Sequence, residues 1–308
     1  MRVVIVTGKE PHHRHLCAVT TQAHNVVGII HPAEPAAGPR LKARRLVQEA
    51  GRLGWPVLIL HFLGKALRGH RGDGPGPEGG AAAQASFSES LAAYERIPAS
   101  LIHSGCHIRD AGSDALLRSL EPDVTICLGG PVYPKRFIEA SPLMLNFHSG
   151  ISPIYNGARS IHFAFANGHP HLCGGTLMLM EPEIDGGRIL GHYLPEVQSG
   201  DTPDSLFAKT VRGAASMYAR VLDHLKTHGA ALQSVPQPPP LFYTRGAQFG
   251  WYHQAATVRN LRADLAARHQ RPETVLEYWR EPSGTDAAKA LRCMLEQLLW
   301  KDGAQPRP

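Results

Sequence analysis

Cysteine is scarce in this 308-residue sequence, and the cysteines that occur form no recognisable pair. There are five of them, an odd number, and none is spaced as C-x-x-C. Such a pattern argues against a disulfide framework and against a zinc ribbon, and it favours free thiols in a reducing compartment. The five are Cys17, Cys106, Cys127, Cys173 and Cys293.

The sequence also has no long apolar segment. No run of about 18 apolar residues occurs anywhere in it. The apolar stretch at the amino terminus, within MRVVIVTGKE, is too short for a signal peptide. We therefore expect a cytoplasmic protein with no membrane partner.

Charge of one sign is not concentrated in any block. The formal net charge of +6 and the pI near 9.2 allow an anionic partner in principle. The densest basic region, however, reads as the solvated face of helices rather than a phosphate-binding patch, so nucleic acid is not the partner that we expect. This region contains Arg40, Lys42, Arg44, Arg45, Lys65, Arg68 and Arg71.

Motifs for a covalent nucleophile or a metal are missing as well. There is no G-x-S-x-G, and Cys173 lies in a glycine-rich strand start without an identified base. The histidines of HHRH, at positions 12, 13 and 15, lack a carboxylate or cysteine at a familiar ligand spacing, and we expect His169 and His171 to be ordinary loop residues. The sequence therefore predicts direct transfer chemistry and no resident metal.

Short apolar runs that alternate with amphipathic segments indicate the fold. This order is typical of βαβ units, so we predict an α/β protein with a Rossmann-like, mostly parallel open sheet and helices on both faces. Strands are expected at 2–7, 25–31, 56–60, 101–106, 123–128, 143–148, 174–180 and 189–197, the last two related as a hairpin. Helices are expected at 41–53, 86–95, 114–120, 160–167 and 201–228, and residues 71–80 are expected to form a loop.

The composition changes after residue 232. A proline-rich crossing segment, SVPQPPPLFYTRG, is followed by three predicted helices at 256–267, 272–279 and 285–299. We therefore predict a catalytic domain at 1–232, with residues 233–308 forming the crossing segment and a helical extension.

The stretch LMLNFHSGISPIYNGAR, at 143–159, carries the chemistry. Asn146 and His148 lie two apart at the end of a predicted strand, so their side chains project from the same face. Asp185, in the loop EIDGG, supplies a carboxylate that orients an imidazole. An amide and a protonated imidazole together suit attack by an amine on a small carbonyl carbon, where negative charge develops on oxygen.

Several linked motifs resemble one known family. They are N-F-H-x-G-x-x-P-x-Y-x-G from Asn146, C-G-G-T from Cys173, E-I-D-G-G-R-I-L from Glu183, and D-T at Asp201. In this order they resemble the 10-formyltetrahydrofolate-dependent formyltransferases. That family includes glycinamide ribonucleotide transformylase, methionyl-tRNA formyltransferase and sugar N-formyltransferases.

The resemblance implies a function and roles for the residues of the site. The protein would move a formyl group from 10-formyltetrahydrofolate to an amine of a small molecule, such as an amino sugar, an amino acid or hydroxylamine, or a carrier-bound metabolite. Asn146 and His148 would stabilise the oxyanion, and Asp185 would orient His148 and assist proton removal. The pterin would be bound by the segments containing Gly130, Pro131, Val132, Glu183 and Ile184, and the acceptor would meet Gly150, Tyr155 and Arg159.

Departures from the family pattern leave other functions open. Many relatives carry Ser where this chain has Gly150, a basic residue at Asn156, and His at Met178. The helical reading of the tail does not fit the barrel domain of tRNA formyltransferases, so a non-tRNA acceptor is expected, and a homodimer is compatible with the sequence. Two alternatives are a formyltetrahydrofolate hydrolase and a folate-binding homologue without turnover.

Overall fold

The computed structural model describes residues 1–33, 85–229 and 231–299. The predicted helix at 41–53, strand at 56–60, loop at 71–80 and basic region from Arg40 to Arg71 all lie outside these residues.

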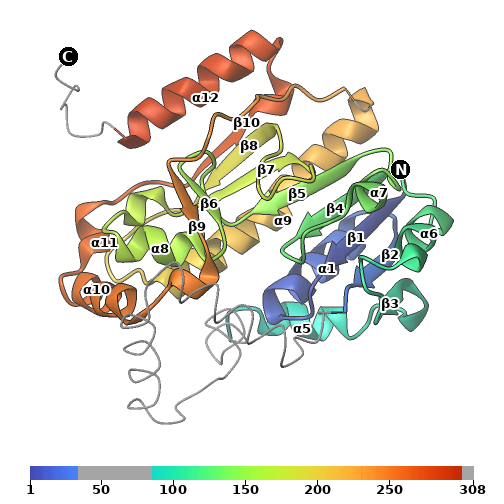
Figure 1. Ribbon diagram of the computed structural model, residues 1–308, viewed down its shortest axis with the longest axis horizontal. Helices are drawn as coiled ribbons and strands as arrows, with labels where there is room; N and C mark the ends of the chain where they lie inside the picture. The colour runs from blue at the N-terminus through green and yellow to red at the C-terminus, as the bar shows by residue number, and fades with distance from the viewer. Residues whose placement is uncertain (34–84, 230, 300–308) are drawn as a thin grey trace, which may run out of the picture.

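A single mixed sheet forms the centre of the molecule (Figure 1). Its eight described strands have the order β10-β8-β7-β5-β4-β1-β2-β3. From β3 to β5 the neighbouring strands are parallel, whereas β7, β8 and β10 each pair antiparallel to their neighbours. The strands are β1 (Val3–Thr7), β2 (Val26–His31), β3 (Ile102–Ser104), β4 (Val124–Leu128), β5 (Met144–His148), β7 (Gly175–Leu179), β8 (Ile189–Leu194) and β10 (Thr274–Glu277).

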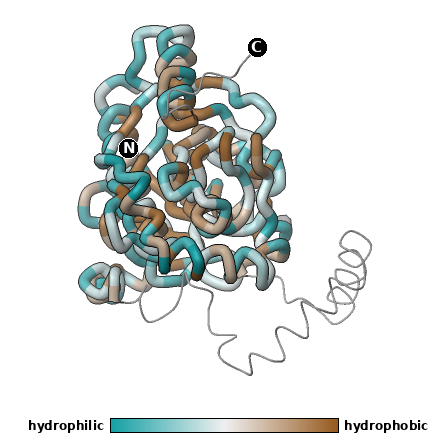
Figure 2. Tube along the Cα trace, turned by 90° about the vertical axis from the view of Figure 1, so that its left-hand side faces the viewer, coloured by the Kyte–Doolittle hydropathy of each residue, from teal (hydrophilic) through white to brown (hydrophobic). Residues whose placement is uncertain are grey.

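Helices cover both faces of this sheet, as the sequence predicts. The larger core lies under α1, α8 and α9, and a smaller core lies under α6 and α7 on the opposite face. Hydrophobic segments accordingly concentrate inside the molecule (Figure 2). The helices are α1 (Pro11–Ala23), α5 (Ser88–Tyr94), α6 (Ala111–Ser119), α7 (Lys135–Ile138), α8 (Ser160–Ala166) and α9 (Pro203–His228).

The start of α9 shows how local sequence sets an element boundary. Thr202 accepts a hydrogen bond from the Ser205 backbone at 3.0 Å, and the Ser205 hydroxyl accepts one from the Thr202 backbone at 2.9 Å. This capping box satisfies backbone donors that the first helical turn leaves without partners, and Pro203 occupies the first helical position. The predicted D-T-P start signal is therefore confirmed.

The C-terminal segment is not the purely helical extension that the sequence predicts. The predicted helix at 272–279 is wrong, because Thr274–Glu277 forms β10, which pairs with the outer edge of β8. A β-branched run beside an open sheet edge gains ladder hydrogen bonds that a short isolated helix cannot match. The other two helical predictions correspond to α10 (Trp251–Arg262) with α11 (Leu265–Arg268), and to α12 (Gly284–Leu299).

A second, small sheet joins the C-terminal segment to the middle of the chain. β6 (Tyr155–Gly157) pairs in parallel with β9 (Phe242–Thr244). Hydrogen-bonded strands thus cross the predicted boundary at residue 232 twice, and the division into 1–232 and 233–308 stays a prediction. None of the described helices is long and apolar enough to cross a membrane.

Candidate active site

β5 delivers Asn146 and His148 to the carboxyl edge of the parallel strands. The Phe147 side chain is turned into the larger core, where its ring lies 6.4 Å from that of Tyr218. β5 is adjacent to β4, so the segments NFHSG and CLGGPVYP end on neighbouring strands, as predicted. The edge therefore collects polar side chains from one segment beside the exposed backbone of the other.

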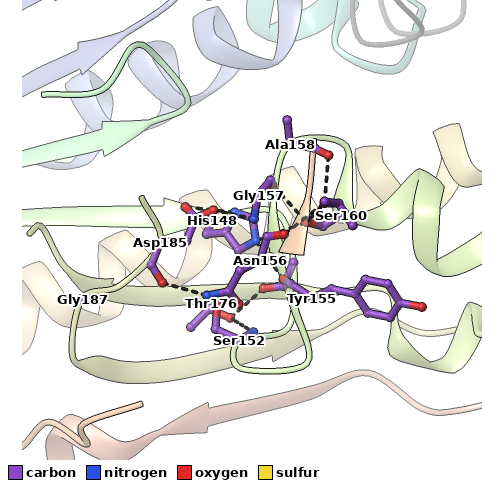
Figure 3. Close-up of polar contacts among 12 residues, drawn as sticks. His148, Ser152, Tyr155, Asn156, Gly157, Ala158, Ser160, Thr176, Asp185 and Gly187 are labelled. Carbon is purple, nitrogen blue, oxygen red and sulfur yellow. Dashed lines mark hydrogen bonds and ion pairs between the residues drawn. The ribbon is translucent and has the colours of Figure 1, made fainter. Parts of the chain in front are cut away.

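His148 and Asp185 are brought together (Figure 3). His148 Nδ1 lies 3.3 Å from Asp185 Oδ1, and both side chains are largely buried. His148 Nε2 donates to the carbonyl oxygen of Tyr155 at 3.0 Å. Both ring nitrogens of His148 therefore have a hydrogen-bond acceptor beside them.

Asp185 is fixed by its backbone as well as by its carboxylate. Its φ is +52°, a left-handed conformation that is uncommon outside glycine but accessible to aspartate. Its Oδ2 accepts the Gly157 backbone N–H at 2.7 Å. Its carbonyl oxygen accepts Asn156 Nδ2 at 2.9 Å and Gln237 Nε2 at 2.5 Å. Both carboxylate oxygens are thus occupied, and the loop carrying Asp185 is held from two sides.

Asn146 completes the predicted trio from the neighbouring position on β5. Its half-buried side chain makes no hydrogen bond to the part of the chain that the structure describes. Directly across the sheet lies Met178, which is almost fully buried. Because paired residues on adjacent strands share a face, Met178 places an apolar wall beside the Asn146 amide, where many relatives would place an imidazole.

Position 150 has no space for a side chain. A Cβ on Gly150 would overlap His148 Nε2 and the Tyr155 carbonyl oxygen, and it would lie 2.8 Å from Ser160 Cβ. The Ser160 hydroxyl lies 3.4 Å from His148 Nε2 and donates to the Gly157 carbonyl at 3.0 Å. A hydroxyl from α8 therefore stands beside the imidazole that a serine at position 150 would crowd.

The segments predicted to bind the pterin present exposed backbone and exposed apolar side chains. Gly129 and Gly130 have φ of +63° and +111°, so the turn after β4 depends on glycine. The side chains of Val132 and Ile184 are 43% and 50% exposed. Pro131 and Glu183 are exposed beside them. This combination suits a flat heteroaromatic ring, which needs apolar faces and backbone hydrogen bonds at its edge.

The three predicted acceptor contacts occupy different environments, and their roles stay predictions. Gly150 is buried, so it contributes backbone alone. The Tyr155 ring is fully buried, with its hydroxyl 2.8 Å from His169 Nδ1, and it stacks on Phe242 at 4.7 Å. Arg159 is partly exposed, and its guanidinium lies 4.9 Å from the Phe249 ring centroid.

Three residues that support the site were not predicted. Gln237 binds the carbonyl oxygens of Asp185 and Gly187. The Thr244 hydroxyl contacts the carbonyl oxygens of Asn156 and Ala158, each at 3.0 Å. His192 is the third. No local motif predicts them, because each acts through a long-range contact with the loop after β5 or with the loop after β7 that carries Asp185.

His192 holds the loop after β5 through a hydrogen bond to the backbone of Ser152. Its Nε2 donates to the Ser152 carbonyl at 2.8 Å, so its Nδ1 accepts from the Tyr278 hydroxyl at 3.1 Å. Burial lowers the pKa of His192 to about 4, which keeps the ring neutral and fixes this tautomer. The loop is therefore tied to β8 and to the C-terminal segment through one imidazole.

Cysteine and metal chemistry have little support among the described residues. Burial raises the pKa of the Cys173 thiol to about 12, which disfavours a thiolate nucleophile. In residues 1–33, 85–229 and 231–299, no group of three or more His, Cys, Asp or Glu side chains could hold a metal ion. The polar side chains that the sequence predicts for the site are the amide, imidazole and carboxylate described above.

The fold and this site define a class, an α/β protein with a histidine–aspartate pair at the carboxyl edge of its sheet. Residues 86–222 match the family model described as Formyl transferase. Methionyl-tRNA formyltransferase of Nitratiruptor sp. is 33% identical over 107 residues, which cover 34% of this chain and 35% of that protein. The chain thus spans about a third of the length of this relative.

Solved structures show the same fold at low sequence identity. The N-formyltransferase from Helicobacter canadensis, in complex with folinic acid and dTDP-3-aminofucose, superposes with a TM-score of 0.51 at 11% identity, covering 85% of this chain and 81% of that one. A 4-N formyltransferase from Francisella tularensis gives a TM-score of 0.50 at 15% identity, covering 80% and 77%. The predicted formyltransferase fold is therefore confirmed.

Proposed function

We propose that the protein is an N-formyltransferase that moves a formyl group from 10-formyltetrahydrofolate to an amine of a small-molecule acceptor. The observation that carries this proposal is the contact between His148 and Asp185, with Asn146 on the same strand edge. These residues lie within the segment that matches the formyl transferase family model.

In the proposed reaction, the acceptor amine attacks the formyl carbon and a new C–N bond forms. The carbonyl π electrons move to oxygen, where the Asn146 amide and the His148 imidazolium stabilise the negative charge. When the tetrahedral intermediate collapses, the bond from carbon to N10 of the folate breaks and N10 takes up a proton. Asp185 keeps the imidazole in position and stabilises its positive charge.

The donor is assigned to the edge between β4 and β7. Gly130, Pro131 and Val132 follow β4, while Glu183 and Ile184 lie in the loop after β7, so the two exposed segments flank Asn146 on β5. A ring held there would present its N10 substituent to the amide and imidazole. Backbone groups at glycine turns are suited to the hydrogen-bonding edge of a pterin.

The acceptor is a small amine rather than a macromolecule. The residues after 232 contribute strands to the main and small sheets and three helices, α10 to α12, and no described part of the chain carries the like-charge block expected of a nucleic-acid surface. The Helicobacter canadensis structure contains dTDP-3-aminofucose, which makes amino sugars a suitable first class to test.

A direct assay tests this proposal. The protein is incubated with 10-formyltetrahydrofolate and a panel of dTDP-3-aminofucose, glucosamine, lysine and hydroxylamine, and tetrahydrofolate release is followed together with a gain of one formyl group by mass. We expect a formylated amine with at least one acceptor. Formate in place of a formylated amine would identify a hydrolase, and binding of folinic acid without any release would identify a homologue without turnover.

A further inference from the structure

We propose that Glu10 and His13 form a second histidine–carboxylate pair that takes the proton from the acceptor amine. This inference rests on the proposed formyl transfer and assigns a role to residues that the trio does not include. It follows from the hydrogen bond within the pair, from its place on the sheet edge, and from the way His148 and Asp185 are already engaged.

The pair is well formed at the start of α1. His13 Nδ1 lies 2.6 Å from Glu10 Oε2, which also accepts the Lys9 backbone N–H at 3.0 Å. The hydrogen bond from His13 lowers the pKa of Glu10 to about 2, so this carboxylate stays ionised at all ordinary pH values. An ionised carboxylate that accepts the Nδ1 proton leaves Nε2 as the basic nitrogen of the ring.

The pair shares its edge of the sheet with His148. The register places Thr7 of β1, Leu128 of β4 and Phe147 of β5 in one row, so Gly8, Gly129 and His148 form the next row. The His13 ring lies against both glycines, and a Cβ on Gly129 would lie 3.0 Å from its Nε2. Since adjacent strands are about 5 Å apart, the register places the backbone of Gly8 and that of His148 roughly 10 Å apart along this edge of the sheet.

A side chain of α9, Phe207, packs near the start of α1 and near the start of α8. The Phe207 ring of α9 lies 5.2 Å from the His12 ring and 6.4 Å from the His162 ring. His162 follows Ser160, whose hydroxyl lies 3.4 Å from His148 Nε2. Phe207 of α9 therefore lies close to the start of α1 and to the start of α8.

The trio leaves the role of proton acceptor open. His148 Nε2 donates to the Tyr155 carbonyl and its Nδ1 faces Asp185, so both ring nitrogens already have partners within the protein. Asp185 Oδ2 is occupied by the Gly157 N–H. His13 Nε2, by contrast, makes no hydrogen bond within the described residues, and the residue is 8% exposed.

The proton balance is completed by exchange with water. As the amine nitrogen bonds to the formyl carbon, one of its protons passes to His13 Nε2, and Glu10 stabilises the resulting imidazolium. As the bond to N10 breaks, N10 takes up a proton from water, and the His13 imidazolium returns its proton to water.

The charged and titratable groups around His13 come from two elements. They are Glu10, Lys9 and His12 on its own segment and His31 from β2. Burial lowers the pKa of His31, so this ring is neutral and adds no charge at neutral pH. Glu10 is the carboxylate that shares a hydrogen bond with the His13 ring.

The test compares His13→Gln and Glu10→Gln with His15→Gln, a control on the same helix whose ring instead contacts Ser90. Formylation of dTDP-3-aminofucose and of hydroxylamine is measured against pH, and folinic acid binding reports on folding and donor binding. We expect kcat to fall about 100-fold in His13→Gln and about 10-fold in Glu10→Gln, with folinic acid affinity within twofold of the parent. The loss should be smaller with hydroxylamine, whose amine is uncharged at neutral pH.

Imidazole rescue separates a proton role from a structural one. Added imidazole should restore His13→Ala at least fivefold without affecting Asp185→Ala. An unchanged rate in His13→Gln, or a loss that imidazole does not rescue and that leaves the pH profile unaltered, would overturn the inference while the formyl transfer of the parent protein stands. If the parent protein formylates no amine of the panel, the proposed function and the inference fall together.

Discussion

Gln237 donates a hydrogen bond from Nε2 to the backbone carbonyl oxygen of Asp185 at 2.5 Å. The two residues are 52 positions apart, and Gln237 lies in the proline-rich crossing segment. The same amide nitrogen reaches the Gly187 carbonyl at 2.8 Å, and its oxygen accepts Asn156 Nδ2 at 3.2 Å. A segment outside the matched family region therefore holds the loop that carries the candidate carboxylate.

Gln237→Ala should reduce turnover about tenfold, because a catalytic group that is free to shift by a fraction of an ångström loses productive geometry. The Michaelis constant for the donor should change little. The exposed Gln248→Ala is the matched control. Steady-state kinetics check this expectation, and equal rates for the two variants would show that the loop keeps its position without Gln237.

Asp185→Asn should lower kcat between about 10²-fold and 10⁴-fold while folinic acid binding is retained. Asparagine tolerates the left-handed backbone at this position, so the change removes the charge without straining the loop. The control is Asp204→Asn, which alters the exposed aspartate 3.2 Å from His162. A fully active Asp185→Asn protein would refute the role given to the carboxylate.

Gly150→Ser should both destabilise the protein by about 1 to 3 kcal/mol and abolish most activity, because the new Cβ overlaps His148 Nε2 and the Tyr155 carbonyl. Gly112→Ser is the control, since a Cβ on Gly112 meets nothing within 4 Å. Urea denaturation and the transfer assay measure the two effects. Parent-like stability and turnover would mean that the loop after β5 adapts to the family serine.

His192 should make folding sensitive to acid. Its pKa of about 4 in the folded protein lies below the ordinary value of 6.5, so the unfolded chain binds the proton more readily. Stability should fall as pH drops from about 6.5 towards 4, and this one group accounts for roughly 3 kcal/mol of the fall. Above pH 6.5 it contributes no pH dependence.

His192→Gln tests that expectation in urea titrations between pH 4 and pH 8. The variant should show a flatter dependence of the unfolding free energy on pH than the parent, whatever its stability at pH 8. The exposed His107→Gln serves as the control and should follow the parent. Parallel curves for His192→Gln and the parent would show that other buried groups govern the acid response.

The β-branched runs and the helix cap signals were sufficient to predict most of the main sheet. Val3–Thr7 and Val124–Leu128 are continuous apolar runs because both of their faces are covered, and the register that brings CLGGPVYP beside NFHSG follows from the βαβ order. The strand Thr274–Glu277 was not predicted, because four residues carry too little periodicity and its partner lies about 80 positions earlier on β8.

The candidate site also contains residues that could be predicted from the sequence and residues that could not. Asn146 and His148 could be paired from the sequence because strand alternation fixes their common face. The roles of Gln237, Thr244 and His192 could not be predicted. Their hydrogen bonds to the loops after β5 and β7 join residues that are 40 to 88 positions apart in the sequence. Local patterns identify the candidate catalytic side chains, while long-range packing determines which residues hold the loops around them.

The position of β10 also sets an order of events during synthesis. On the ribosome, Asn146, His148 and Asp185 emerge well before Gln237, Thr244 and Tyr278. Gln237 and Thr244 hydrogen-bond to the loops around the site, and Tyr278 hydrogen-bonds to His192, which holds the loop after β5. Until β10 pairs with β8, the nascent sheet has an unpaired edge at β8. A ribosome-bound chain that stops before residue 274 should therefore be open to chaperones and proteases even though every residue of the trio has already been made.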